Sequence, residues 1–167
     1  DSLSEYDPVD LKSIPHLYPA TKLMGEQLIK SYNLLFGIPY TIFRYGVAYG
    51  ICGHDDGVVA TFIENNLKSK TSTLRGNNKR SFLNIKDHVR ANILALSNEA
   101  KNQTFNLDGG EKISMRDLVL MIEEISKNKS KIKVLPARKN DYEGVDVCNE
   151  KIKKKLVWEQ SISLREG

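Results

Sequence analysis

The chain has few cysteines, no long apolar run and a first segment that is acidic rather than apolar. Its 167 residues include two cysteines, Cys52 and Cys148, too few for a disulfide framework and too far apart for a zinc knuckle. We therefore expect two free thiols. No apolar run approaches the roughly 20 residues that cross a bilayer, and Asp1 and Glu5 stand where a signal peptide would be basic and then apolar. These absences predict a cytoplasmic protein without a membrane partner.

Histidine is scarce, and the residues present do not suggest a metal site. His16, His54 and His88 show no metal-ligand spacing, so we expect no bound metal. Each histidine is predicted to be a surface or capping residue.

The net charge of +4 comes from lysines in the C-terminal half. These lysines alternate with apolar residues, a pattern typical of the solvated faces of a strand and a short helix. No aromatic platform or recognition motif accompanies them, so we do not expect a nucleic-acid partner.

The hydrophobic content of 40% and the aromatic content of 8% are sufficient for a folded core. Helical and strand patterns alternate, which predicts an α/β fold with a mostly parallel sheet. We expect helices over about 19–36, 58–67 and 87–97, then one capped by Ser114 with Asp117 and a short last one capped by Asn149. Strands are expected over 40–45, 104–107 and 132–135.

Tyr18 and Lys22 stand four residues apart at the start of the first expected helix, so their side chains are neighbours on one face. An ammonium beside a phenol favours the phenolate, and a tyrosine in that state can act as an acid or a base. Such chemistry serves proton movement during hydride transfer. Ordinary surface pairs have the same spacing, so the pair alone leaves both interpretations open.

Four segments, in matching order and spacing, resemble the extended short-chain dehydrogenase/reductases that act as NAD-dependent nucleotide-sugar epimerases and dehydratases. The first runs from residue 3 through Tyr18 to the turn at Pro39, and the second is Phe43-Arg44-Tyr45-Gly46-Val47-Ala48-Tyr49-Gly50. Residues 76–87 resemble the family's arginine-bearing hairpin that runs into a helix. Residues 136–141, 157–159 and 163–167 resemble its C-terminal segment.

The resemblance implies the C-terminal part of a Rossmann-like parallel sheet plus a small mixed α/β substrate-binding lobe. The N-terminal dinucleotide-binding half is expected to be absent, because no strand, glycine-rich turn and helix precede Tyr18. Residues 1–50 are expected to belong to the nucleotide-binding domain, and residues 51–167 mainly to the substrate-binding lobe. Residues 87–110 are expected to return to the nucleotide-binding domain.

The resemblance also assigns roles around the cofactor. Tyr18 becomes the catalytic acid and base, and Lys22 its partner, which also bonds the nicotinamide ribose. Both residues, together with Tyr45 beside the nicotinamide, are expected to contact the cofactor. That cofactor is NAD, with NADP as the alternative, and its main binding site is expected to lie outside this chain.

For the substrate, the resemblance assigns Arg80 and Arg138 as a clamp on a diphosphate, since a guanidinium offers two parallel donors to phosphate oxygens. Asp141 is assigned to a ribose hydroxyl of the nucleotide. A surface salt bridge is the alternative role for each arginine. Val47 stands where many members of the family have an asparagine that binds substrate, so the identity of the substrate stays open.

The function implied is epimerisation or dehydration of a nucleotide-diphosphate sugar by a larger parent enzyme, an isomerase or lyase, with this chain alone inactive. Members of the family commonly pair through the tyrosine helix, so we expect a homodimer. The alternative is a non-catalytic nucleotide-sugar-binding or scaffold module.

Overall fold

The computed structural model describes residues 2–10, 12, 14, 16–51, 57–76, 78–137 and 144–167. The predicted α/β class is confirmed. The elements are α1 (Leu17–Phe36), β1 (Thr41–Tyr45), β2 (Val47–Tyr49), α2 (Val58–Leu67), β3 (Thr71–Arg75), β4 (Lys79–Asn84), α3 (Ile85–Leu94), the 3₁₀ helix η2 (Asn98–Ala100), β5 (Gln103–Leu107), β6 (Lys112–Ser114), α4 (Met115–Ser126), β7 (Lys131–Leu135) and α5 (Glu150–Leu156). In this part of the chain, no helix is long and apolar enough to span a membrane.

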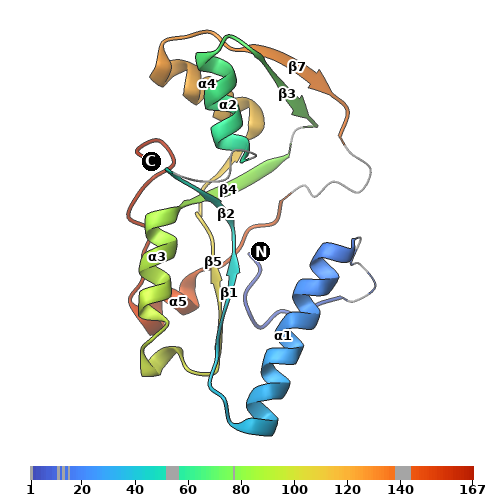
Figure 1. The fold of residues 1–167 in the computed structure, drawn as a ribbon, viewed down its shortest axis with the longest axis vertical. Coiled ribbons are helices and arrows are strands. Elements are labelled where there is room, and N and C mark those ends of the chain that lie inside the picture. Colours follow the sequence, from blue (N-terminus) through green and yellow to red (C-terminus); the bar gives the residue numbers. More distant parts are fainter. Residues whose placement is uncertain are drawn as a thin grey trace.

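The strands form three small sheets. β1 pairs with β5 and β3 pairs with β7, both in parallel, while β4 lies between a parallel β2 and an antiparallel β6. Figure 1 shows β1 and β5 between α1 on one side and α3 with α5 on the other, and α2, α4, β3 and β7 gathered at the opposite end. The two ends are joined through β2 and β4.

The predicted hairpin over residues 76–87 is wrong. β3 and β4 flank Gly76, but β3 pairs with β7 while β4 pairs with β2 and β6. Gly76 instead turns the chain at a φ of +62°, and a Cβ there would lie 2.9 Å from Cβ of Ala137. The segment therefore moves the chain from one sheet to another before it enters α3.

Strand β4 also connects two apolar cores, because neighbouring side chains on a strand point to opposite faces. Leu83 belongs to a core with Phe105, Leu107, Ile152 and Trp158, between the β1–β5 sheet, α3 and α5. Phe82 belongs to a second core with residues of α2 and α4, among them Phe62, Leu118 and Ile122. Each end of the molecule thus has its own core.

The first helix begins two residues before the predicted start and ends as predicted. Gly37 adopts a φ of +67° and donates its N–H to the Asn33 carbonyl. This bond gives a partner to one of the carbonyl groups that the end of the helix leaves unpaired. The predicted apolar stripe is in place, but it has no cover within the described part of this chain. Its side chains are 51–74% exposed and belong to Met24, Leu28, Tyr32 and Leu35.

One of the two expected helix caps is present and the other is not. Ser114 caps α4 as predicted, since its hydroxyl accepts the N–H of Asp117 at 3.0 Å. Helix α3 begins before Asp87, and Asn84 caps it by accepting the Lys86 N–H at 3.0 Å. Asn149 precedes α5 but makes no cap bond with its side chain, because that amide binds the backbone of Asp108.

Asp87, in the first turn of α3, anchors the C-terminal segment. Its carboxylate is fully buried and accepts from the N–H groups of Ser161 and Ile162 at 3.1–3.2 Å and from the Ser161 hydroxyl at 2.6 Å. The Asp87 carbonyl accepts from the indole of Trp158 at 3.1 Å. These bonds fasten residues 158–162 against α3.

Candidate functional site

A pocket of about 390 Å³ lies where the carboxyl ends of β1 and β5 meet the start of β4. Parallel strands present their ends together at such an edge, which is the usual place for a ligand in α/β proteins. The lining residues come from distant parts of the sequence: Tyr18, Tyr45, Gly46, Val47, Lys79, Arg80, Ser81, Asp108, Lys112, Gly144, Val145 and Val147. Three residues predicted for the site therefore share one pocket.

Tyr18 reaches this pocket from the first turn of α1, and Lys22 lies one turn further on. The Lys22 ammonium is 5.2 Å from the centre of the Tyr18 ring, so the two side chains are neighbours as predicted. Tyr18 is 72% exposed, which leaves its hydroxyl accessible to a ligand. Thr21, between them, donates its hydroxyl to the Tyr18 carbonyl at 2.8 Å and fixes only backbone.

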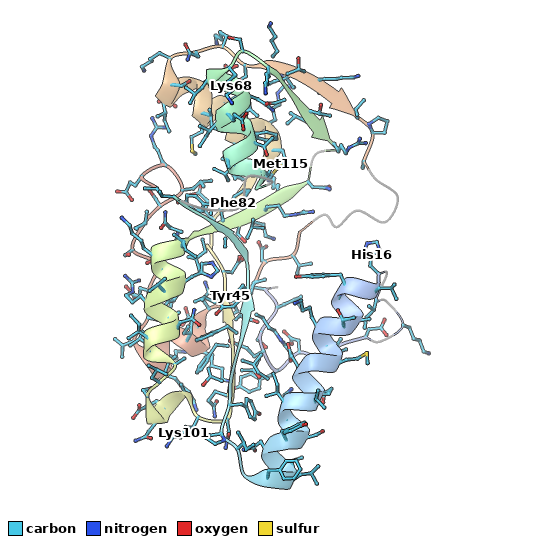
Figure 2. All side chains as sticks on the ribbon, viewed as in Figure 1. His16, Tyr45, Lys68, Phe82, Lys101 and Met115 are labelled. Carbon is cyan, nitrogen blue, oxygen red and sulfur yellow. The ribbon has the colours of Figure 1, made fainter. Side chains whose placement is uncertain are left out.

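Tyr45 ends β1 and contacts α3 through its side chain. Its ring is stacked on His88 with the ring centroids 4.8 Å apart, and its hydroxyl lies 3.1 Å from Oδ1 of Asn92. Figure 2 labels Tyr45 beside β1, in the middle of the molecule. His88 is 6% exposed, so its predicted surface or capping role is wrong. Burial lowers the pKa of His88, and the neighbouring Asp87 carboxylate opposes that shift.

Arg80 lines the same pocket from β4, and one of its guanidinium nitrogens donates to the Lys79 carbonyl at 2.9 Å. Lys79 and Lys112 add two further cations to the lining. The pocket therefore carries three positive side chains suited to an anionic ligand group. Arg138 and Asp141, the other residues assigned to the substrate, lie outside the described residues, as do Cys52 and His54.

A bidentate ion pair joins α1 to β1. Arg44 donates from Nε to Oε1 of Glu26 at 2.7 Å and from a terminal nitrogen to Oε2 at 2.9 Å. These bonds from Arg44 hold the pKa of Glu26 below its ordinary value of 4.5. The helix that carries Tyr18 is thus fixed to the strand that carries Tyr45.

Sequence reasoning missed an acidic residue in the pocket. Asp108 is 4% exposed and accepts a hydrogen bond from the hydroxyl of Ser81. A signal was present, because an acidic residue directly follows the strand predicted over 104–107, at the carboxyl end of a parallel strand. For Lys79 and Lys112 the sequence offers no such signal.

A larger hollow of about 690 Å³ lies beside the C-terminal segment, between Gly110, Met121, Leu164 and neighbouring residues. It contains none of the residues predicted for the site. The chemistry-bearing residues gather in the smaller pocket, which we take as the candidate site.

Comparisons with known proteins place these features in a family. The chain is 33% identical over 157 residues to a putative UDP-glucose 4-epimerase of Methanocaldococcus jannaschii, covering 90% of this chain and 50% of that protein. The crystal structure of UDP-glucose 4-epimerase from Thermotoga maritima with UDP-glucose superposes with a TM-score of 0.85 at 30% identity, over 90% of this chain and 50% of that one. UDP-glucuronic acid 4-epimerase from Bacillus cereus, in complex with UDP-glucuronic acid and NAD, superposes with a TM-score of 0.85 at 27% identity, over 98% of this chain and 55% of that one.

The chain therefore spans about half the length of the relatives it matches. The family match itself extends over residues 4–108, from the segment before Tyr18 to the buried Asp108, and so includes α1, β1, β4 and β5. Because this match includes more than half of its residues, the chain belongs to the NAD dependent epimerase/dehydratase family.

Proposed function

We propose that this chain is the C-terminal part of an NAD-dependent enzyme that epimerises or dehydrates a nucleotide-diphosphate sugar. The observation that carries the proposal is the shared pocket, where Tyr18 from α1, the end of β1 and Arg80 from β4 meet. The family membership and the UDP-sugar ligand named for the Thermotoga maritima structure support it.

The residues present fit one end of NAD. Lys22 and Tyr18 are exposed on one face of α1, so an ammonium and a hydroxyl are available to the hydroxyls of a nicotinamide ribose. When bound, NAD supplies the acceptor and donor of a hydride. NADP is the alternative cofactor, and the pyrophosphate-binding part is proposed to lie outside this chain.

The protein's own residues then move one proton and hold the substrate. The Tyr18 phenolate accepts the proton of a sugar hydroxyl while the carbon that bears it is oxidised, and returns a proton when that carbon is reduced. The Lys22 ammonium stabilises the phenolate. Arg80, with Arg138 as its proposed partner, binds the diphosphate, and Asp141 a ribose hydroxyl.

The proposal includes the division of the chain. We propose that residues 1–50 and 87–110 belong to a nucleotide-binding domain, because β1 and β5 form one parallel sheet. The remaining residues would form a substrate lobe. Location in the cytoplasm stays a prediction.

We also propose a homodimer that covers the exposed apolar side chains of α1, since solvent-exposed apolar patches of this kind drive association. Sedimentation of the full-length protein tests this. A strictly monomeric species at high concentration would contradict it.

The experiment for the activity is Tyr18→Phe in the full-length enzyme, with UDP-glucose as substrate and identification of the products. We expect turnover to fall by about 100- to 10,000-fold with no loss of folding, since only the proton-transfer group is removed. Tyr32→Phe, on the same helix but outside the pocket, is the matched control. If Tyr18→Phe keeps more than about a tenth of the activity, Tyr18 is an ordinary helix residue and not the proton-transfer group. If the wild type binds the nucleotide sugar without turnover, the non-catalytic module is the better description. An inverted sugar indicates an epimerase, and loss of water a dehydratase.

A further inference from the structure

The pocket contains one buried carboxylate that the proposed reaction does not use. Asp108 is 4% exposed, and the hydroxyl of Ser81 donates to its Oδ1. Within the described residues, no lysine or arginine forms an ion pair with Asp108, although Lys112 nearby lies 2.6 Å from Asp146. Buried charges in proteins are normally paired or well hydrogen-bonded. A carboxylate with a single hydroxyl donor has lone pairs left for a further donor.

The side chain of Asn149 binds both the N–H and the carbonyl of Asp108. Its N–H donates to Oδ1 of Asn149 at 3.1 Å, and its carbonyl accepts from Nδ2 of Asn149 at 2.8 Å. This pair of bonds explains why Asn149 does not cap α5. The carboxylate is therefore carried on backbone that Asn149 holds in place directly after β5.

Gly46 provides the space that the carboxylate occupies. A Cβ at position 46 would lie 2.1 Å from Oδ1 of Asp108, so any larger residue would displace the side chain. The two positions meet because β1 and β5 are parallel neighbours with Tyr45 opposite Leu107, and the Gly46 N–H donates to the Leu107 carbonyl at 2.8 Å. Val47, the next residue in the lining, is apolar and provides no hydrogen bond from its side chain.

The described lining residues therefore carry charges of both signs. Lys79, Arg80 and Lys112 are cationic, and Asp108 is the one acidic residue among the described lining residues. A nucleotide sugar offers both kinds of group, an anionic diphosphate for the cations and a neutral, hydroxyl-bearing sugar for Asp108. A carboxylate on the sugar would be repelled by Asp108, because like charges at a buried site repel.

We infer that Asp108 determines sugar specificity by accepting a hydrogen bond from a sugar hydroxyl, and that the pocket favours a neutral hexose over a uronic acid. This inference rests on the proposed function, since it requires that a nucleotide sugar occupies the pocket.

Calorimetric titration of the full-length protein with UDP, UDP-glucose and UDP-glucuronate tests it. Asp108→Asn keeps the shape and an acceptor for Ser81 but removes the charge. We expect its affinity for UDP-glucose to fall about 5- to 10-fold, the difference between a charge-assisted and a neutral hydrogen bond. Affinity for UDP-glucuronate should rise and that for UDP should not change. A purely structural role would move both sugars in the same direction.

Gly46→Ala provides an independent second variant, because it displaces the carboxylate without changing its charge. It should also lower the affinity for UDP-glucose relative to UDP. Unchanged ratios among the three ligands in both variants would overturn the inference while leaving the proposed function intact. A wild-type protein that binds none of the three would instead contradict the proposed function and the inference with it.

Discussion

The ring of Tyr45 is stacked on the imidazole of His88, with centroids 4.8 Å apart and ring planes inclined by 28°. This contact joins a residue of the pocket lining to a buried, titratable side chain of α3. Around His88 lie the Asp87 carboxylate on its own helix, Asn92 one turn on, and Tyr45 from β1. A pH dependence of stability follows from this arrangement.

We predict that His88 makes the protein less stable in mild acid. Burial lowers the pKa of His88 below 6.5, so the unfolded chain binds more protons than the folded one. The stability that neutral His88 allows is present above pH 6.5 and is lost as the pH falls through the lowered pKa of His88. Thermal unfolding at pH 7.5 and 5.5 should show a larger drop in Tm for the wild type than for His88→Phe. His16→Gln, at an exposed position, should behave as the wild type, and an equal drop in His88→Phe would contradict the prediction.

The bidentate pair of Arg44 with Glu26 should stabilise the docking of α1 on β1. We expect Arg44→Met to cost about 1 to 2 kcal/mol in the free energy of unfolding, because two partly buried charge-assisted bonds are lost. Since the pKa of Glu26 is lowered, this stabilisation is present above pH 4.5 and disappears as the pH falls through the lowered value. Denaturant unfolding provides the measurement. Lys68→Met, which removes an exposed ion pair with Glu64, should change little.

Two glycines should respond oppositely to alanine. A Cβ at Gly109 would lie 2.0 Å from the Phe82 carbonyl oxygen, so Gly109→Ala should destabilise the protein by about 3 kcal/mol. Gly25, within α1, has nothing within 4 Å of such a Cβ, and Gly25→Ala should stabilise the helix by about 0.5 to 1 kcal/mol. Thermal unfolding of both variants decides. If Gly25→Ala destabilises the full-length protein, a partner subunit or another part of the enzyme packs on this face of α1.

Arg80→Ala in the full-length enzyme should weaken the binding of UDP-glucose by about 1.5 to 3 kcal/mol, the range for a hydrogen bond to a charged group. Affinity for NAD should not change, because Arg80 is assigned to the diphosphate of the substrate. Arg116→Ala, an exposed arginine on α4 outside the pocket lining, is the matched control. Equal affinities for UDP-glucose in the two variants would remove Arg80 from the site.

Lys22→Met should lower turnover and move the pH optimum upward, because the Tyr18 phenolate loses its neighbouring positive charge. The rate of UDP-glucose conversion, measured from pH 6 to 10 for the wild type and the variant, provides the comparison. A reduced rate with an unmoved optimum would indicate that Lys22 only positions ligands.

Local pattern was enough to predict the helices and part of the site. The spacing of apolar residues and Gly37 predicted α1, and Ser114 with Asp117 predicted the start of α4, because helical contacts and caps join residues three to five apart. The neighbourhood of Tyr18 and Lys22 follows from the same periodicity. Their catalytic roles stay predictions.

Strand pairing and the composition of the pocket were decided only by the tertiary structure. The pairing of β3 with β7 joins residues 60 positions apart along the chain, from Thr71 to Lys131, and no local pattern specifies such a partner. Asp108 reaches Gly46 only because β1 and β5 are parallel and in register, which brings two separate strand ends to one edge. The sequence by itself thus determined the helices, the strands β1, β5 and β7 and the chemical types available, since these depend on neighbouring residues. Which side chains meet in the pocket, and which histidine is buried, depended on long-range packing that only the folded chain provides.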